Sequence, residues 1–172
     1  CEVYPDITII FLPGIQEYAK DRIGHGQHAC PDENLTGLAS SDCGMLAPFG
    51  DGLLEGAGPR ATIVDGFESS YAFTLNKRFV EGRQRIANAY EVSSVPKLYD
   101  QRMKVGFGLM LDMRYTARGG WRLNPENFVN NHFTPAEFSN ALYFSMLNAD
   151  RYVWVWNELN GAVFLDAPPR DP

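Results

Sequence analysis

The sequence has no excess of basic residues and no long hydrophobic run. Its 172 residues include 15 Lys and Arg against 21 Asp and Glu, so the formal net charge is −6. A chain without an excess of Lys and Arg cannot neutralise many phosphates of a nucleic-acid backbone, which argues against a nucleic-acid partner. The longest apolar runs fall well short of the roughly 18 residues that a membrane-spanning helix needs, so the sequence predicts no membrane partner.

Cysteine is also scarce, with only Cys1, Cys30 and Cys43. Three cysteines allow at most one internal disulfide, and Cys30 with Cys43 is the favoured pair if the protein is secreted. The count does not fix the compartment, although a secreted or periplasmic location is favoured. Cys1 is also where a mature bacterial lipoprotein begins, but a predicted strand follows too closely to leave a tether. Because the chain begins with Cys1 and not with Met, we expect a processed, trimmed or partial chain.

Motifs for metal or phosphate chemistry are few. His25 and His28 lie near Cys30 and Cys43, but their spacing matches no standard zinc site. The glycines between residues 50 and 58 lack the Lys of a phosphate-binding loop, and no Gly-x-Ser-x-Gly elbow occurs. The sequence therefore predicts no metal and no other cofactor. A zinc-dependent hydrolase that uses the His25 and His28 loop stays as a third alternative.

The chain does have a globular composition, with 45% hydrophobic and 13% aromatic residues. Its hydrophobic patterning predicts one domain over residues 1–166 and a flexible, proline-rich tail over 167–172. The predicted strands cover residues 7–12, 61–64, 105–111 and 152–156. The predicted helices cover residues 45–55, 75–90, 96–103 and 135–147. Thr74 is the expected N-cap of the second helix, and Thr134 with Glu137 forms a capping box before the fourth.

The alternation of strands and helices predicts an α/β fold in which parallel strands are joined by right-handed crossovers. Four such units make half of an eight-stranded (β/α) barrel, and a whole barrel needs about 250 residues. The expected fold class is therefore a parallel (β/α) half-barrel of about four strands. A half that forms a homodimer to complete the barrel, a fragment of a longer chain and a small open sheet all remain open.

Acidic residues follow three of the four predicted strands. Asp65 closes the second strand with Glu68 just beyond it, Asp112 closes the third, and Glu158 closes the fourth. Parallel folds carry their chemistry at the carboxyl ends of the strands, so these four side chains are the candidate catalytic residues. An Asp after a strand is also common as a turn or capping residue, which is the structural alternative for each of them.

Aromatic residues accompany these acids along the sequence. Tyr71, Tyr115, Trp121 and Trp156 lie near the same strand ends, and Asn157 precedes Glu158. Sugar rings stack their C–H faces on aromatic rings, while amide and carboxylate groups bind sugar hydroxyls. The pattern therefore favours an oligosaccharide or polysaccharide as the substrate, and these five residues are the candidate substrate-binding set.

Four segments of the chain, taken in order, resemble the C-terminal half of poorly characterised bacterial proteins with a glycoside-hydrolase-like (β/α)8 barrel. They are DGFESSY (65–71), GFGLMLD (106–112), FTPAEF (133–138) and DRYVWVWNE (150–158). The resemblance covers about residues 45–160, and it implies strands five to eight of such a barrel and a carbohydrate substrate. Many barrel hydrolases carry their acid/base after strand four, so Glu68 or a second copy of the chain would have to supply it here.

These observations predict a glycoside hydrolase that degrades a polysaccharide, with a β-glucan such as cellulose as the expected substrate. Two carboxyl groups on either side of a glycosidic bond are the usual apparatus of this reaction. We expect Glu158 to be the nucleophile or base and Glu68 the acid, while Asp65 and Asp112 tune their protonation and hold sugar hydroxyls. The alternative is a carbohydrate-binding or scaffold fragment of a larger barrel without turnover.

Overall fold

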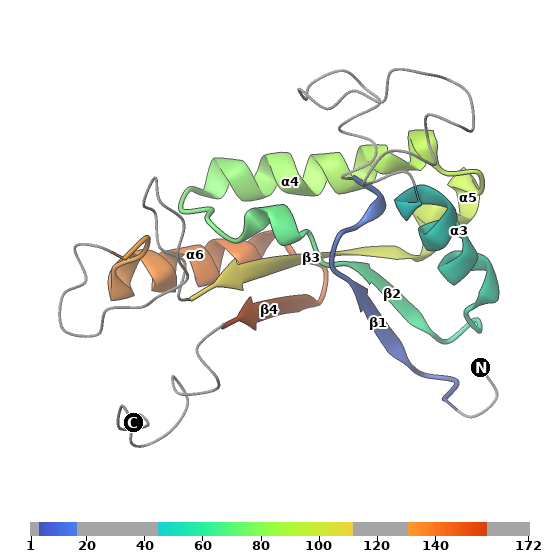
Figure 1. The fold of residues 1–172 in the computed structure, drawn as a ribbon, viewed down its shortest axis with the longest axis horizontal. Coiled ribbons are helices and arrows are strands. Elements are labelled where there is room, and N and C mark those ends of the chain that lie inside the picture. Colours follow the sequence, from blue (N-terminus) through green and yellow to red (C-terminus); the bar gives the residue numbers. More distant parts are fainter. Residues whose placement is uncertain (1–3, 17–44, 112–130, 158–172) are drawn as a thin grey trace.

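A computed structural model describes residues 4–16, 45–111 and 131–157 of the chain. Four parallel strands pair in sequence order into one curled sheet (Figure 1). They are β1 (Thr8–Phe11), β2 (Thr62–Asp65), β3 (Met103–Met110) and β4 (Tyr152–Trp156). The α/β half-barrel predicted from the alternation of strands and helices is thereby confirmed.

In the described residues, four α-helices flank the sheet, and two short 3₁₀ turns join the elements. The helices are α3 (Leu46–Gly56), α4 (Asn76–Asn88), α5 (Pro96–Arg102) and α6 (Pro135–Asn148). The 3₁₀ turns are η1 (Glu68–Ser70) and η2 (Ala89–Val92). Of these, η1 directly follows β2 and therefore lies at the carboxyl edge of the sheet.

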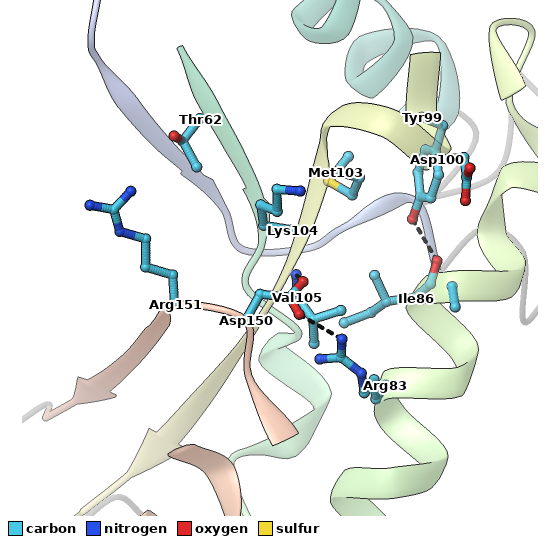
Figure 2. A pocket seen from close by; sticks show the side chains of 11 residues that line it. Thr62, Arg83, Ile86, Tyr99, Asp100, Met103, Lys104, Val105, Asp150 and Arg151 are labelled. Atoms are coloured by element: carbon cyan, nitrogen blue, oxygen red, sulfur yellow. Dashed lines mark hydrogen bonds and ion pairs between the residues drawn. The ribbon is translucent and has the colours of Figure 1, made fainter. Parts of the chain in front are cut away.

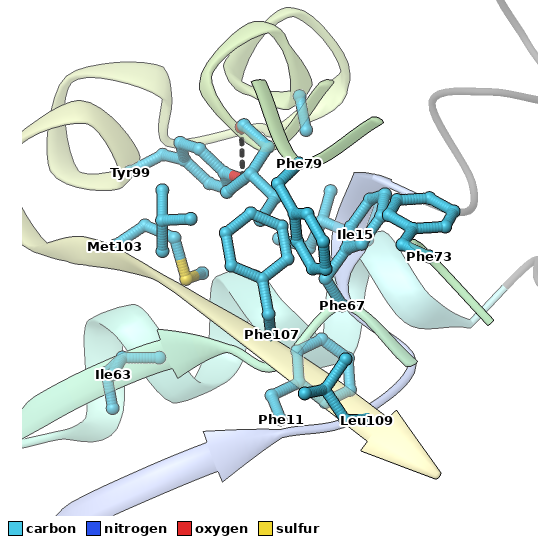
Figure 3. Close-up of a cluster of buried hydrophobic side chains, with 14 of the residues drawn as sticks. Phe11, Ile15, Ile63, Phe67, Phe73, Phe79, Tyr99, Met103, Phe107 and Leu109 are labelled. Carbon is cyan, nitrogen blue, oxygen red and sulfur yellow. Dashed lines mark hydrogen bonds between the residues drawn. The ribbon is translucent and has the colours of Figure 1, made fainter. Parts of the chain in front are cut away.

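The side chains of β3 alternate between two faces of the sheet. Val105, Phe107 and Leu109 belong to the core beneath the helices. Within that core Phe107 meets the rings of Phe67 and Phe79 edge-on, with centroids 5.7 and 5.3 Å away (Figure 3). Such edge-to-face pairs stabilise a core beyond the area that they bury. The convex face of the sheet is thus fixed to the helix layer by a cluster of phenylalanines.

The opposite face of β3 carries glycines, and their lack of a side chain explains the curl of the sheet. A Cβ added at Gly108 would lie 2.5 Å from Cζ2 of Trp154, and one added at Gly106 would lie 2.8 Å from Cγ1 of Val64. Side chains from β2 and β4 therefore close over β3. The first and last strands also meet on this concave face, where Thr8 Oγ1 and Tyr152 OH lie 3.2 Å apart.

Helix α6 begins as its sequence predicts. Thr134 Oγ1 accepts a hydrogen bond from the Glu137 amide, and the Glu137 side chain accepts one from the Thr134 amide, which completes the capping box. The rings of Phe133 and Phe138 pack edge-on with centroids 5.5 Å apart, as a hydrophobic staple requires.

The helix ends lie within two residues of their predicted positions, and two of the differences have an identifiable cause. Helix α4 begins at Asn76 with Leu75 as its N-cap and no side-chain capping bond, so the expected cap at Thr74 is wrong. The helix expected to reach Met103 ends at Arg102, because Met103 pairs with Ile63 and starts β3. Sheet pairing at Met103 therefore overrides the local helical pattern.

In the described part of the chain, no helix combines the length and the hydrophobicity needed to cross a membrane.

Candidate functional site

The carboxyl edge of the sheet is built around the turn that follows β2. Asp65 is the last residue of β2 and is fully buried, and its Oδ1 accepts a hydrogen bond from the Phe67 amide (3.1 Å). A Cβ added at Gly14 would collide with the Asp65 carboxyl group, so glycine at that position permits their close approach. The Asp65 side chain is thus enclosed between the segment after β1 and the turn after β2.

Phe67 gives this turn an unusual backbone conformation. Its φ of 42° and ψ of 65° lie in the left-handed region, where Phe67 is the only non-glycine residue of the described chain with a positive φ. Such strain is retained where the surrounding structure overdetermines it, often at functional sites. Here the buried ring of Phe67 packs against Phe73 and Phe107, which holds the backbone in place.

Ser70 attaches the next turn to the neighbouring strand. Its Oγ lies 2.7 Å from the carbonyl oxygens of both Phe67 and Gly108 and accepts a hydrogen bond from the Gly108 amide (3.0 Å). Ser70 has no exposed surface. The position of η1, and therefore of Glu68 at its start, is fixed by bonds from Ser70 to the turn after β2 and to β3.

Glu68, Tyr71 and Trp154 form a connected group at this edge, which we call the rim cluster. Tyr71 OH donates a hydrogen bond to Glu68 Oε1 (3.1 Å), and the Tyr71 ring meets the Trp154 ring edge-on with centroids 5.3 Å apart. Trp154 Nε1 in turn donates to the carbonyl oxygen of Gly66 (2.8 Å). In the rim cluster, Tyr71 therefore links a half-buried carboxylate to the Trp154 ring.

Trp156 extends the aromatic surface beyond the rim cluster. It lies on the same face of β4 as Trp154, because side chains alternate along a strand. Trp156 is 43% exposed, whereas Trp154 is half-buried. Asn157 follows it and is half-buried. The structure thus presents one well-exposed indole near the predicted substrate position.

The predicted site residues fall into two groups. Asp65, Glu68, Tyr71, Trp156 and Asn157 lie in the described part of the chain, where Tyr71 contacts Glu68 directly and Asp65 is enclosed. Outside the described residues lie Asp112, Tyr115, Trp121 and Glu158. The alternative zinc ligands are outside as well, namely His25, His28, Cys30 and Cys43. Among described residues, no group of three or more His, Cys, Asp or Glu side chains could hold a metal ion.

A cavity of about 570 Å³ lies at the opposite, amino edge of the sheet (Figure 2). We call it the amino-edge cavity. It is lined by Thr62, Arg83, Ile86, Ala87, Tyr99, Asp100, Met103, Lys104, Val105, Asp150 and Arg151. No short motif in the sequence indicates this cavity, because its lining residues are spread from Thr62 to Arg151 along the chain.

The polar wall of the amino-edge cavity is organised by Asp150. This carboxylate accepts hydrogen bonds from the Val105 amide (2.8 Å) and from the Arg83 guanidinium (2.6 Å). Partial burial raises the pKa of Asp150, but the hydrogen bonds from Val105 and Arg83, together with the positive charges of Arg83 and Lys104, outweigh burial, so the pKa is lower than usual. Arg83 also donates to the carbonyl oxygen of Asn148 (2.6 Å). Arg83 thus connects α4 to the start of β4.

Tyr99 forms the apolar wall of the same cavity. It is buried, and its hydroxyl donates a hydrogen bond to the carbonyl oxygen of Ile86 (2.8 Å). Burial raises the pKa of Tyr99 far above its usual value, and the negative charges of Asp65 and Asp51 raise it further. Tyr99 is therefore a neutral, structural side chain.

Comparison of the chain with known protein families, curated proteins and solved structures gives no significant match.

Proposed function

We propose that this protein is a carbohydrate-active hydrolase that binds a polysaccharide at the carboxyl edge of its sheet. The observation that supports the proposal is the rim cluster, in which Tyr71 donates a hydrogen bond to the Glu68 carboxylate and meets the Trp154 ring edge-on. A carboxyl group next to aromatic surface is what a glycosidic bond between stacked sugar rings requires.

In the proposed reaction, Glu68 is the acid and Glu158 the nucleophile or base. Tyr71 holds Oε1 of Glu68 at 3.1 Å, and Oε2 would carry the proton to the glycosidic oxygen. Asp65 has no exposed surface, so it acts as a positioning residue that fixes the turn before Glu68. Asp112 would then bind a sugar hydroxyl.

Aromatic side chains would bind the substrate. Trp156, which is 43% exposed, offers an indole face to a sugar ring. Tyr115 and Trp121 would extend this surface, and Asn157 would bind hydroxyl groups. A β-glucan such as cellulose, whose rings are flat and repeat along the chain, suits such a row of aromatic faces.

Reducing-sugar release from a panel of polysaccharides that includes β-glucans tests the proposal. Removal of a general acid or base typically costs about 10²–10⁴-fold in rate. We therefore expect Glu68→Gln and Glu158→Gln each to lose at least a hundredfold in activity, with melting temperatures within a few degrees of wild type. The control is Glu55→Gln on the exposed face of α3, which should keep full activity. Full activity in either test variant would refute its assigned role.

A carbohydrate-binding protein without turnover is the second candidate, and the burial of Asp65 favours it. Of the two predicted catalytic acids in the described chain, Glu68 alone reaches solvent. Under this alternative, wild type binds the polysaccharide and releases no sugar. Trp156→Ala would then reduce binding, whereas Glu68→Gln would leave it within about twofold.

A second copy of the chain is the proposed protein partner. The sheet has β1 at one edge and β4 at the other, so a two-fold axis along the barrel would join β4 of each copy to β1 of its partner. Eight parallel strands would then close, as in a complete (β/α)8 barrel.

A further inference from the structure

We infer that the amino-edge cavity binds a small anionic molecule, carrying a carboxylate or phosphate group, through Lys104 and Arg151. The site is separate from the rim cluster and rests on no step of the proposed hydrolysis. Its volume, about 570 Å³, falls within the usual range for small-molecule sites.

The charged groups of the lining do not cancel each other. Arg83, Lys104 and Arg151 are cationic, and Asp100 and Asp150 are anionic, so the cavity is locally positive in a chain of net charge −6. A local excess of positive charge in an acidic protein is unfavourable for other cations and attracts small anions.

Internal bonds already occupy one of these cations. Arg83 forms an ion pair with Asp150 at 2.6 Å, and Asp150 also accepts a hydrogen bond from the Val105 amide. The charges of Arg83 and Asp150 are therefore bonded to each other on one wall of the cavity. Within the described residues, neither Lys104 nor Arg151 forms an ion pair with a carboxylate. The charge of Lys104 helps to lower the pKa of Asp150, but neither cation is bonded to that carboxylate, so the donor groups of Lys104 and Arg151 are the ones available to a ligand.

The amino ends of the strands bring Lys104 and Arg151 to the same edge. Lys104 is the second residue of β3, in register with Val64, and Arg151 directly precedes β4. The Arg151 guanidinium lies 5.5 Å from the centroid of the Tyr152 ring, an attraction that restricts its motion. Thr62, at the start of β2, adds a hydroxyl group.

The other residues of the cavity lining indicate which kind of molecule would fit beside the anionic group. Figure 2 shows Thr62 and Arg151 on the side of the cavity away from Tyr99 and Ile86, with Lys104 between them. On this second side the Tyr99 hydroxyl donates a hydrogen bond to the carbonyl oxygen of Ile86, and the carboxylate of Asp100 lies beside Tyr99 (Figure 2). The anionic group of a ligand is therefore expected at the Lys104 and Arg151 side, away from Asp100, with the uncharged part of the molecule against Tyr99 and Ile86.

Isothermal titration with citrate and with inorganic phosphate, at constant ionic strength, tests the inference. We expect saturable binding of at least one of these anions by wild type. Lys104→Met and Arg151→Gln should each weaken that binding at least tenfold, because each removes a charge that faces the ligand. Lys97→Met removes an equal charge from the exposed face of α5, outside the cavity, and should leave affinity within twofold.

A second readout separates a site from general charge effects. Citrate or phosphate should shift the NMR signals of the Val105 and Asp150 amides in wild type, and Lys104→Met should reduce these shifts while its other signals stay in place. Equal weakening by Lys97→Met and Lys104→Met would overturn the inference, as would binding that disappears when chloride replaces part of the salt at the same ionic strength. If wild type binds the anion but releases no sugar from any polysaccharide, the proposed hydrolysis is wrong and the anion site is unaffected.

Discussion

Gly108 is the residue on which the shape of the concave face depends most directly. A Cβ at this position would lie 2.5 Å from Cζ2 of Trp154 and 3.0 Å from Cε1 of Tyr71, so a methyl group would displace the rim cluster. We expect Gly108→Ala to lower the free energy of unfolding by about 1–3 kcal/mol, the usual cost of overpacking. Urea denaturation measures this loss.

Gly52 supplies the matched control for that substitution. It lies within α3, and a Cβ there would meet no atom within 4 Å. Gly52→Ala should leave stability unchanged or raise it by up to about 1 kcal/mol, because alanine favours a helix more than glycine does. Equal effects of the two substitutions would contradict the tight packing described for Gly108.

Asp150 should make stability depend on pH. Its pKa in the folded protein lies below the usual 3.8, since the hydrogen bonds from Val105 and Arg83 and the positive charges of Arg83 and Lys104 outweigh burial. Its contribution is therefore fully present above that value and is lost as the pH falls through the folded-state pKa. We expect Asp150→Asn to cost about 1–3 kcal/mol at pH 7, because a charge-assisted hydrogen bond is lost. The difference from wild type should shrink below about pH 4.

Denaturation curves of both proteins between pH 3 and 7 measure this difference. Asp6→Asn is the control, because the Asp6 and Arg60 pair is exposed and exposed pairs contribute little stability. A cost of Asp150→Asn that stays constant down to pH 3 would show that the charge of Asp150 is not its source.

At the residue level the sequence could identify Asp65 but not its surroundings. The apolar run before it predicted that Asp65 closes a strand, which is confirmed. A strand that is buried on both faces has no alternating pattern, so nothing in the sequence indicated that Asp65 is enclosed beside Gly14. The hydrogen bond between Tyr71 and Glu68 joins residues three apart in the chain. It depends on the 3₁₀ turn η1, which the sequence did not predict.

Among the helices, α6 has a start that local sequence encodes completely. Thr134→Ala removes the acceptor of the Glu137 amide and should lower the free energy of unfolding by roughly 0.5–2 kcal/mol, the range for lost N-caps. Ser139→Ala, on the exposed surface of the same helix, should change stability by less than about 0.5 kcal/mol. Thermal and urea denaturation compare the two, and equal losses would contradict a specific role for the cap.

The helices also show where local signals stop being informative. The capping box of α6 lies within four residues and was predicted correctly, whereas α4 starts after Leu75, which has no side-chain cap. The end of α5 depends on distant contacts, because the Arg102 guanidinium donates to the carbonyl oxygens of Leu54 and Gly58 near the end of α3. Contacts between residues more than forty apart are not visible in a local pattern.

For the whole molecule, connection rules were sufficient for the order of strands. The half-barrel expectation, in which each strand lies beside the next in the chain, gives the order β1-β2-β3-β4 that the sheet shows. The contact between Thr8 and Tyr152, by contrast, depends on glycines in a third strand. The degree of curl therefore could not be predicted, and neither could the cavity at the amino edge.

The strands at the two ends of the curled sheet, β1 and β4, are where a second copy of the chain would pair. An exposed strand edge is a template for pairing, and β4 carries Val155 at 37% exposure near α6, where Tyr143, Met146 and Leu147 are also exposed. If a second copy pairs with this edge, light scattering should give a molar mass twice the 19.3 kDa of one chain. Val155→Lys should shift the protein toward the monomer, because a lysine at a strand edge opposes pairing.

Val80→Lys replaces an exposed valine on α4, away from the sheet edges, and should leave the dimer intact. Measurement over a hundredfold range of concentration distinguishes a weak dimer from none, since dimerisation depends on mass action. If wild type remains monomeric throughout, the barrel is not completed by a second copy. The acid/base function would then rest on Glu68 within one chain, and Glu68→Gln would be the decisive substitution for activity.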